Sequence, residues 1–134
     1  AGDCNSWYES GPVEDVLKYA EPVKVHGLSL LNAPGNDLVA SNALVASGAH
    51  VVLFTTGRGT PFGCPVPTVK VSSNTALYEK KGNWIDFNAA PMLEGKHLAG
   101  ELLQYVINVA NGLETANERE GYREIAIFKD GVTL

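Results

Sequence analysis

The sequence that decides the fold is VVLFTTGRGTPFG, at residues 51–63. It begins with four apolar residues, all β-branched or aromatic except Leu53, which is typical of a strand buried on both faces of a parallel sheet. The stretch then becomes polar and rich in glycine. Because ligands of open α/β sheets bind at the carboxyl ends of the strands, we expect a central strand over residues 50–55 and a binding site in the loop after it.

The side chains of this loop suit an anionic ligand. Arg58 offers a planar fork of donors for a carboxylate or phosphate, and Thr55 and Thr56 add hydroxyl groups. Glycines at positions 57, 59 and 63 allow sharp turns and a close approach of the backbone. In the alternative interpretation, Arg58 fixes the loop through an ion pair and the glycines serve only the turn. The residue types alone leave both interpretations open.

The composition indicates one domain with a single hydrophobic core. The chain has 134 residues, of which 45% are hydrophobic and 19% charged, and this apolar content argues against disorder. The formal net charge of -5 argues against nucleic acid or an anionic membrane as the main partner.

The cysteines and the amino terminus bear on the compartment. Cys4 and Cys64 lack the spacing of a zinc site, while a disulfide between them stays open. Residues 1–5 lack the order of a signal peptide, and no apolar run approaches a membrane span. We therefore expect a cytoplasmic protein, and the missing initiator methionine suggests a fragment or a processed product.

Strands and helices are predicted to alternate along the chain, which indicates an α/β domain with a mostly parallel sheet. Residues 1–12 resemble a linker, and residues 13–134 form the domain. A β-α-β unit with a right-handed crossover is predicted over residues 23–55. In the first half of the chain we predict a helix at 13–20, a strand at 23–31, a helix that starts at residue 36 or 37, and a strand at 50–55. In the second half we predict a less buried strand at 68–72, a helix at 76–81, a strand at 84–88 and a helix at 94–111 closed by Gly112. A solvated connection at 113–123 and a strand at 124–128 complete the set.

Four further residues are candidates for a site. Asp37 either caps its helix or presents a carboxylate for metal binding or proton transfer. Asn74 lies in the polar exit of the strand at 68–72 and supplies a hydrogen-bonding group. Asp86 stands among apolar neighbours, where a surface position is the commoner outcome and a partnered carboxylate the alternative. Lys70 is expected to be solvated, although desolvation would make it a candidate base.

The glycine-rich stretch at residues 57–63 does not match the common phosphate-binding motifs. It lacks the Gly-Lys-Ser/Thr of a P-loop, and its glycine spacing differs from GxGxxG. No GxSxG nucleophile motif occurs in the chain. Nucleotide binding is therefore the less favoured interpretation.

Several ordered motifs resemble those of a known family. They are PGND at 34–37, FTTGRGTPFG at 54–63, PTVK at 67–70, WIDFNA at 84–89 and the terminal FKDGVTL at 128–134. From about Pro12 to Leu134 the chain resembles the C-terminal region of the altronate dehydratase (altronate hydrolase) and galactarate dehydratase family. Ala90 stands where that family usually has glycine.

The resemblance implies an enzyme that removes water from a sugar acid and yields a 2-keto-3-deoxy acid. It implies a lyase that depends on Fe²⁺ or Mn²⁺, in which a Rossmann-like, three-layer C-terminal domain works together with the remaining domains of a longer protein. A second copy of the chain, in a homo-oligomer, is a further expected partner. A non-catalytic Rossmann-like module that binds a small anion or a nucleotide is the main alternative. A structural domain that oligomerises through residues 1–12 is another.

The dehydratase hypothesis gives each candidate residue a role. Arg58 binds the substrate carboxylate, while Thr55, Thr56 and Asn74 hold substrate hydroxyls. Asp37 is assigned to proton transfer together with Arg58 in the catalytic set, and Asp86 is assigned to the metal.

Overall fold

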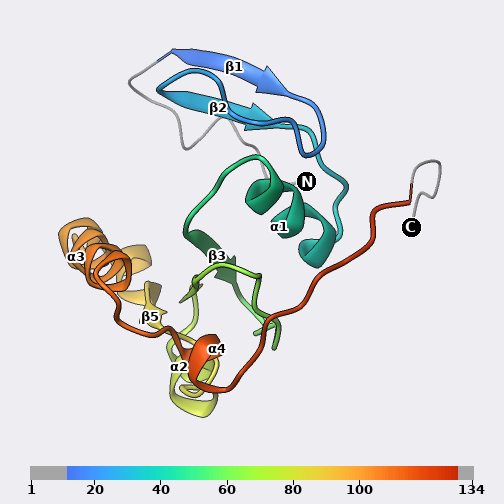
Figure 1. Cartoon of the computed structure of the whole chain (residues 1–134). Coiled ribbons are helices and arrows are strands. Elements are labelled where there is room, and N and C mark those ends of the chain that lie inside the picture. The colour runs from blue at the N-terminus through green and yellow to red at the C-terminus, as the bar shows by residue number, and fades with distance from the viewer. Residues whose placement is uncertain (1–11, 130–134) are drawn as a thin grey trace.

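The computed structural model describes residues 12–129 and shows parallel strands flanked by helices (Figure 1). The predicted α/β class is therefore confirmed. In chain order the elements are β1 (Val13–Leu17), β2 (Leu28–Leu31), α1 (Asp37–Ala46), β3 (Val52–Thr56), β4 (Thr68–Ser72), α2 (Thr75–Lys80), β5 (Phe87–Asn88), the 3-10 helix η2 (Ala90–Glu94), α3 (Ala99–Ala110) and α4 (Ala116–Arg119).

The strands form two separate sheets rather than one. A three-stranded sheet has the order β3-β4-β5, and a two-stranded sheet contains β1 and β2. All neighbouring strands are parallel. The prediction that residues 23–55 form a β-α-β unit within one sheet is wrong, because β2 pairs with β1 while β3 pairs with β4.

The predicted helix at residues 13–20 is wrong, because Val13–Leu17 form strand β1. Backbone pairing with β2 satisfies the polar groups of this segment, and the ladder continues in the bond from Asn32 N to the Leu17 carbonyl at 2.9 Å. The valines of the segment favour a strand once a partner is available. The strand predicted at 23–31 is correspondingly short, since it begins only at Leu28.

Strand β4 is the most buried strand, although its alternating sequence predicts a less buried one. All five of its residues are buried, because β4 lies between β3 and β5. Strand β3 lies at the edge of the same sheet, and its Leu53 side chain is 51% exposed. The expectation that residues 50–55 form the strand buried on both faces is therefore wrong.

Two apolar clusters lie on this sheet. One contains Val52, Phe62 and Cys64, with residues of α1 packed against it. The other joins β4 to α3 through Val109. Helix α3 begins at residue 99 rather than 94, because η2 ends at Glu94 and residues 95–98 connect it to α3. Gly112 follows α3 with a φ of 104°, in the left-handed region that favours glycine at a helix end.

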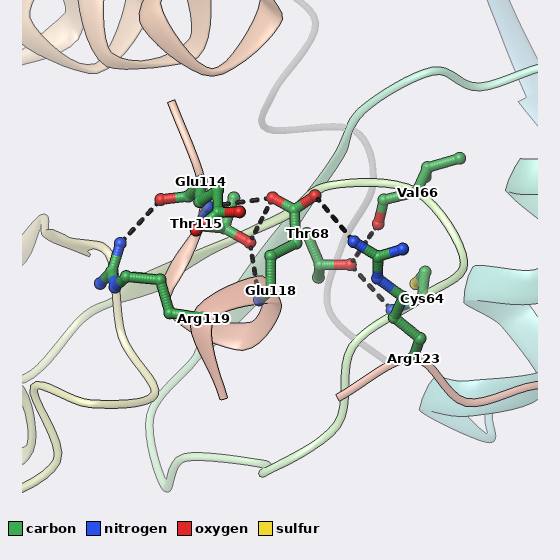
Figure 2. A network of polar contacts seen from close by, with 8 residues as sticks. All are labelled: Cys64, Val66, Thr68, Glu114, Thr115, Glu118, Arg119 and Arg123. Carbon is green, nitrogen blue, oxygen red and sulfur yellow. Dashed lines mark hydrogen bonds and ion pairs between the residues drawn. The ribbon is translucent and has the colours of Figure 1, made fainter. Parts of the chain in front are cut away.

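The segment predicted as a solvated connection contains helix α4. Thr115, its N-cap, is fully buried and forms a capping box with Glu118 (Figure 2). The Glu118 carboxylate accepts hydrogen bonds from the backbone N and the hydroxyl of Thr115, both at 3.0 Å, and lies 3.8 Å from the Arg123 guanidinium. This polar network stabilises the start of α4, the last helix of the described residues, which contacts β4.

The strand predicted at 124–128 is also wrong, because the described residues after α4 include no strand. Ile125 and Ile127 are 78% and 96% exposed. This segment runs from α4 past α1 (Figure 1), and the ring of Phe128 stacks on that of Tyr19 with 4.0 Å between their centroids. None of the helices in residues 12–129 has the length and apolarity that a bilayer crossing requires.

The capping box makes a prediction for Thr115→Ala. Loss of the capping hydroxyl should lower the free energy of unfolding by about 1 kcal/mol, measured by urea denaturation. Glu120→Ala, at the exposed opposite end of α4, should change it by less than about 0.5 kcal/mol. Equal effects of the two substitutions would contradict the capping role.

Candidate functional site

A hollow of about 620 Å³ opens at the carboxyl end of β3 and the loop after it. It brings together four of the residues that the sequence singled out, namely Asp37, Thr55, Thr56 and Arg58. The residues that line it are Asp37, Leu53, Phe54, Thr55, Thr56, Gly57, Arg58 and Thr60.

Helix α1 places Asp37 in this hollow. The helix packs on β3, with Leu38 and Val45 against the cluster that contains Val52. Asn36 caps the helix, since its side-chain oxygen accepts from the Val39 amide at 3.2 Å. The exposed Asp37 carboxylate is therefore free of the capping role. The sequence left both roles open for Asp37.

The loop of residues 56–60, which we call the glycine loop, holds Arg58 at the rim. The Thr56 hydroxyl accepts from the Gly59 amide at 2.9 Å, and Gly59 has a φ of 79°. The ammonium of Lys70 donates to the Thr60 carbonyl. Hydrogen bonds of Thr56 and Thr60 therefore stabilise the two ends of this turn.

Arg58 has no carboxylate partner in this arrangement. Within residues 12–129, the ion pairs are Lys24–Glu21 and Arg123–Glu118. The interpretation that Arg58 fixes its loop through an ion pair thus finds no support there. Its exposed guanidinium can bind an anion from solvent.

Asn74 is not among the residues that line the hollow. It caps α2, where its side-chain oxygen accepts from the Leu77 amide at 3.3 Å. Its peptide nitrogen and carbonyl are both bonded to the Ser72 hydroxyl, at 3.1 and 2.8 Å. The structure therefore gives Asn74 a local role at the start of α2, apart from the other candidates.

Asp86 is half-buried and joins three elements, so the expected surface position is wrong. One carboxylate oxygen accepts from the Tyr105 hydroxyl at 3.0 Å and the Ala116 amide at 2.7 Å, while the other accepts from the Lys70 amide at 2.8 Å. Burial, together with the charge of Asp86, raises the pKa of Tyr105 to about 12. Asp86 thus links β4 to α3 and α4.

The donor set of the described residues does not fit a metal centre. No three His, Cys, Asp or Glu side chains gather anywhere in residues 12–129, whereas iron and manganese sites in proteins need several such ligands. The Asp86 oxygens are already engaged in the bonds above. Cys64 is a buried free thiol that packs with Val52 and Phe62, and Cys4 lies outside the described residues.

The family model described as D-galactarate/Altronate dehydratase, C-terminal, matches residues 4–133. The chain belongs to this family. It is 57% identical to altronate dehydratase of Bacillus subtilis over 135 residues and 52% identical to altronate dehydratase of Escherichia coli over 134, in each case covering 98% of this chain and 27% of the relative. It is 32% identical to the L-threo-forming galactarate dehydratase of Escherichia coli over 123 residues, which is 87% of this chain and 24% of that enzyme.

The chain spans about a quarter of the length of these dehydratases. It corresponds to their C-terminal domain, as the motifs of the sequence suggest. The names of these relatives describe them as dehydratases, which are enzymes that eliminate water.

Lys70 of this dehydratase domain is fully buried, so the expectation of a solvated lysine is wrong. Desolvation lowers the pKa of Lys70 from 10.5 to about 8, although the charges of Asp86 and Glu124 oppose the shift. The Phe62 ring lies 5.2 Å from its ammonium. An alternating strand sequence gives no sign of this burial, because the burial comes from the central position of β4.

The lowered pKa predicts how stability depends on pH. Between about pH 8 and 10.5 the unfolded chain holds a proton on Lys70 that the folded chain has lost, so stability rises with pH across this range. The penalty of about 3 kcal/mol is present in full below pH 8. In Lys70→Met this rise should disappear from urea unfolding measured at pH 7.5 to 10.5, and an unchanged rise would refute the burial of a charged lysine.

Proposed function

We propose that this chain is the C-terminal domain of a dehydratase that converts altronate, or a related sugar acid such as galactarate, to a 2-keto-3-deoxy acid. The observation that carries the proposal is the gathering of an unpaired guanidinium, two hydroxyl groups and a carboxylate in one hollow of a dehydratase-family domain. Together these groups match the parts of a hydroxylated acid.

The reaction removes a proton from the carbon next to the carboxylate and a hydroxide from the following carbon, which together leave as water. The resulting enol then becomes the keto acid. Negative charge develops on the substrate carboxylate as the proton leaves, and a bidentate guanidinium such as that of Arg58 stabilises it. The Asp37 carboxylate is assigned as the proton acceptor.

The threonines are assigned to the substrate hydroxyls. Thr55 is exposed in the hollow, so its hydroxyl can both donate and accept. The Thr56 hydroxyl already accepts from the Gly59 amide, which leaves its proton to donate. Asn74 would join this set only through a rearrangement at the start of α2, because its side chain caps that helix.

The metal that the family resemblance implies, Fe²⁺ or Mn²⁺, is assigned to residues outside the described part of the chain. The absence of a three-ligand cluster in residues 12–129 supports this division. Asp86 serves the packing of α3 and α4 in the same proposal, since its bonds to Tyr105 and Ala116 occupy it.

A second candidate is a module that binds a small anion or nucleotide without catalysis. The unpaired Arg58 favours it, because a free guanidinium at a rim suits any small anion. Calorimetry of the full-length protein distinguishes the two: binding of altronate supports the dehydratase, and binding of a nucleotide without altronate supports the module.

Arg58→Ala tests the assignment of the hollow. In the full-length protein we expect kcat/KM for altronate to fall at least about 100-fold, because a charge-assisted bidentate contact is lost. The formation of keto acid is the measurement. Arg123→Ala is the matched control, since it removes an exposed guanidinium whose weak pair with Glu118 lies outside the hollow. Equal turnover of the Arg58 variant and the control would end the assignment.

The remaining domains of the longer protein are the partners assigned to this domain. Ile125 and Ile127, in the segment after α4, are largely exposed. Burying apolar side chains of this size lowers the free energy. The relatives are about four times as long as the matched part, so they contain chain that can cover these isoleucines.

Ile127→Asp tests this contact in two settings. In the full-length protein we expect the melting temperature to fall by several degrees, because a charge would be buried at a domain interface. In the isolated 134-residue chain the same substitution should have almost no effect, because Ile127 is 96% exposed there. Equal effects in both settings would argue against the interface.

A further inference from the structure

We propose that Lys70 is a positioning residue of the sugar-acid site. Its bond to the Thr60 carbonyl holds the glycine loop in place and thereby fixes Arg58 at the hollow. Lys70 does not line the hollow itself. The inference rests on the proposed function only for its activity readout, because its structural part concerns the loop alone.

The contacts of Lys70 lead directly to the loop. Its side chain starts from the central strand β4 and is fully buried. The ammonium donates to the carbonyl of Thr60, a residue that lines the hollow. Just beyond Thr60, Phe62 is buried in the core and its ring lies 5.2 Å from the ammonium. The lysine and the ring therefore anchor the carboxyl end of the loop.

The amino end of the loop is anchored separately. The Thr56 hydroxyl accepts from the Gly59 amide at 2.9 Å, and the Thr56 carbonyl accepts from the Ser73 amide at 3.2 Å. Arg58 lies inside the turn closed by the bond between Thr56 and Gly59, two residues before the bond at Thr60. Without Lys70, Thr60 itself would lose its bond, and the nearest remaining anchors would lie further along the chain, in the packing of Phe62 and the bonds between Gly63 and Glu124.

A buried lysine in a strand lowers the stability of the fold relative to an apolar residue. Desolvation disfavours its charged form, and within residues 12–129 no ion pair at 4 Å or closer compensates for it. An apolar side chain of similar length would pack there without this cost. The bond to the loop is what the ammonium adds, because an apolar side chain cannot donate to the Thr60 carbonyl.

Trypsin cleavage after Arg58 measures the positioning directly. Arg58 is exposed on the loop, and cleavage there requires the loop to open from its turn. In full-length Lys70→Met we expect cleavage after Arg58, followed by mass spectrometry, to be about tenfold faster than in the wild type, as loss of a charged hydrogen bond predicts. Unchanged cleavage would overturn the proposal.

Thr68→Val is the matched control for general destabilisation. Thr68 is buried two residues earlier in the same strand, but its hydroxyl accepts from the Cys64 amide at 2.9 Å and donates to the Val66 carbonyl at 3.1 Å (Figure 2). Its loss should leave cleavage after Arg58 within about twofold of the wild type. If this variant accelerates cleavage as much as Lys70→Met, the effect is global and the proposal fails.

A measurement on the wild type covers the case in which Lys70→Met does not fold. Acetylation of the folded full-length protein with a small amine reagent should modify Lys70 at least about tenfold more slowly than the exposed Lys80, because the ammonium of Lys70 is buried and bonded. Equal rates would show that the bond to Thr60 is not maintained, which overturns the proposal.

Steady-state kinetics then connect the loop to the substrate. For Lys70→Met we expect KM for altronate to rise about tenfold with a smaller change in kcat, and Lys70→Arg, which keeps a charged donor, should restore KM in part. Thr68→Val should leave KM unchanged, and an unchanged KM in Lys70→Met would overturn the link to the substrate. If the wild type does not dehydrate altronate, the proposed function fails, while cleavage and acetylation still decide the role of Lys70.

Discussion

The complete burial of strand β4 is the constraint on which the site depends. Side chains of a strand alternate between its faces, and one face of β4 carries the polar residues Thr68, Lys70 and Ser72, all nearly without exposure. Because buried polar groups need partners, each of them reaches a different part of the neighbouring loops. Thr68 bonds to the segment at Cys64, Lys70 to Thr60, and Ser72 to Asn74. The polar face of β4 therefore organises both loops that flank the strand.

The sequence predicts the elements whose signals are local. The glycine loop follows its strand as expected, and the bonds of Thr56 and the left-handed Gly59 show why glycine is needed there. Asn36 begins α1, as its capping side chain indicates. The failures are non-local. Residues 13–17 show helical spacing, and only pairing with β2 makes them a strand. Likewise, the order of strands in the sheet, which no short pattern contains, decides that β4 is buried and β3 exposed.

The sequence predicts most residues of the hollow, although one premise of that prediction is wrong. The sequence places Asp37 near Arg58 on the premise that both follow strands of one sheet. In the structure β2 and β3 belong to different sheets, and Asp37 reaches the hollow because α1 packs on β3. Asn74 follows a strand next to β3, yet the need to cap α2 directs its side chain elsewhere. Position at a sheet edge therefore selects candidates, while the hydrogen-bonding needs of each helix start decide which remain free.

In the proposed function, the arrangement of charges orients an acid within the hollow. Arg58 attracts the carboxylate of a substrate to the glycine loop, and Asp37 repels it from the start of α1. Under the proposed function, a sugar acid is therefore expected to bind with its carboxylate at the loop and its carbon chain toward α1. In this orientation the carbon that loses the proton, which is bonded to the carboxylate, would lie between the two charged side chains.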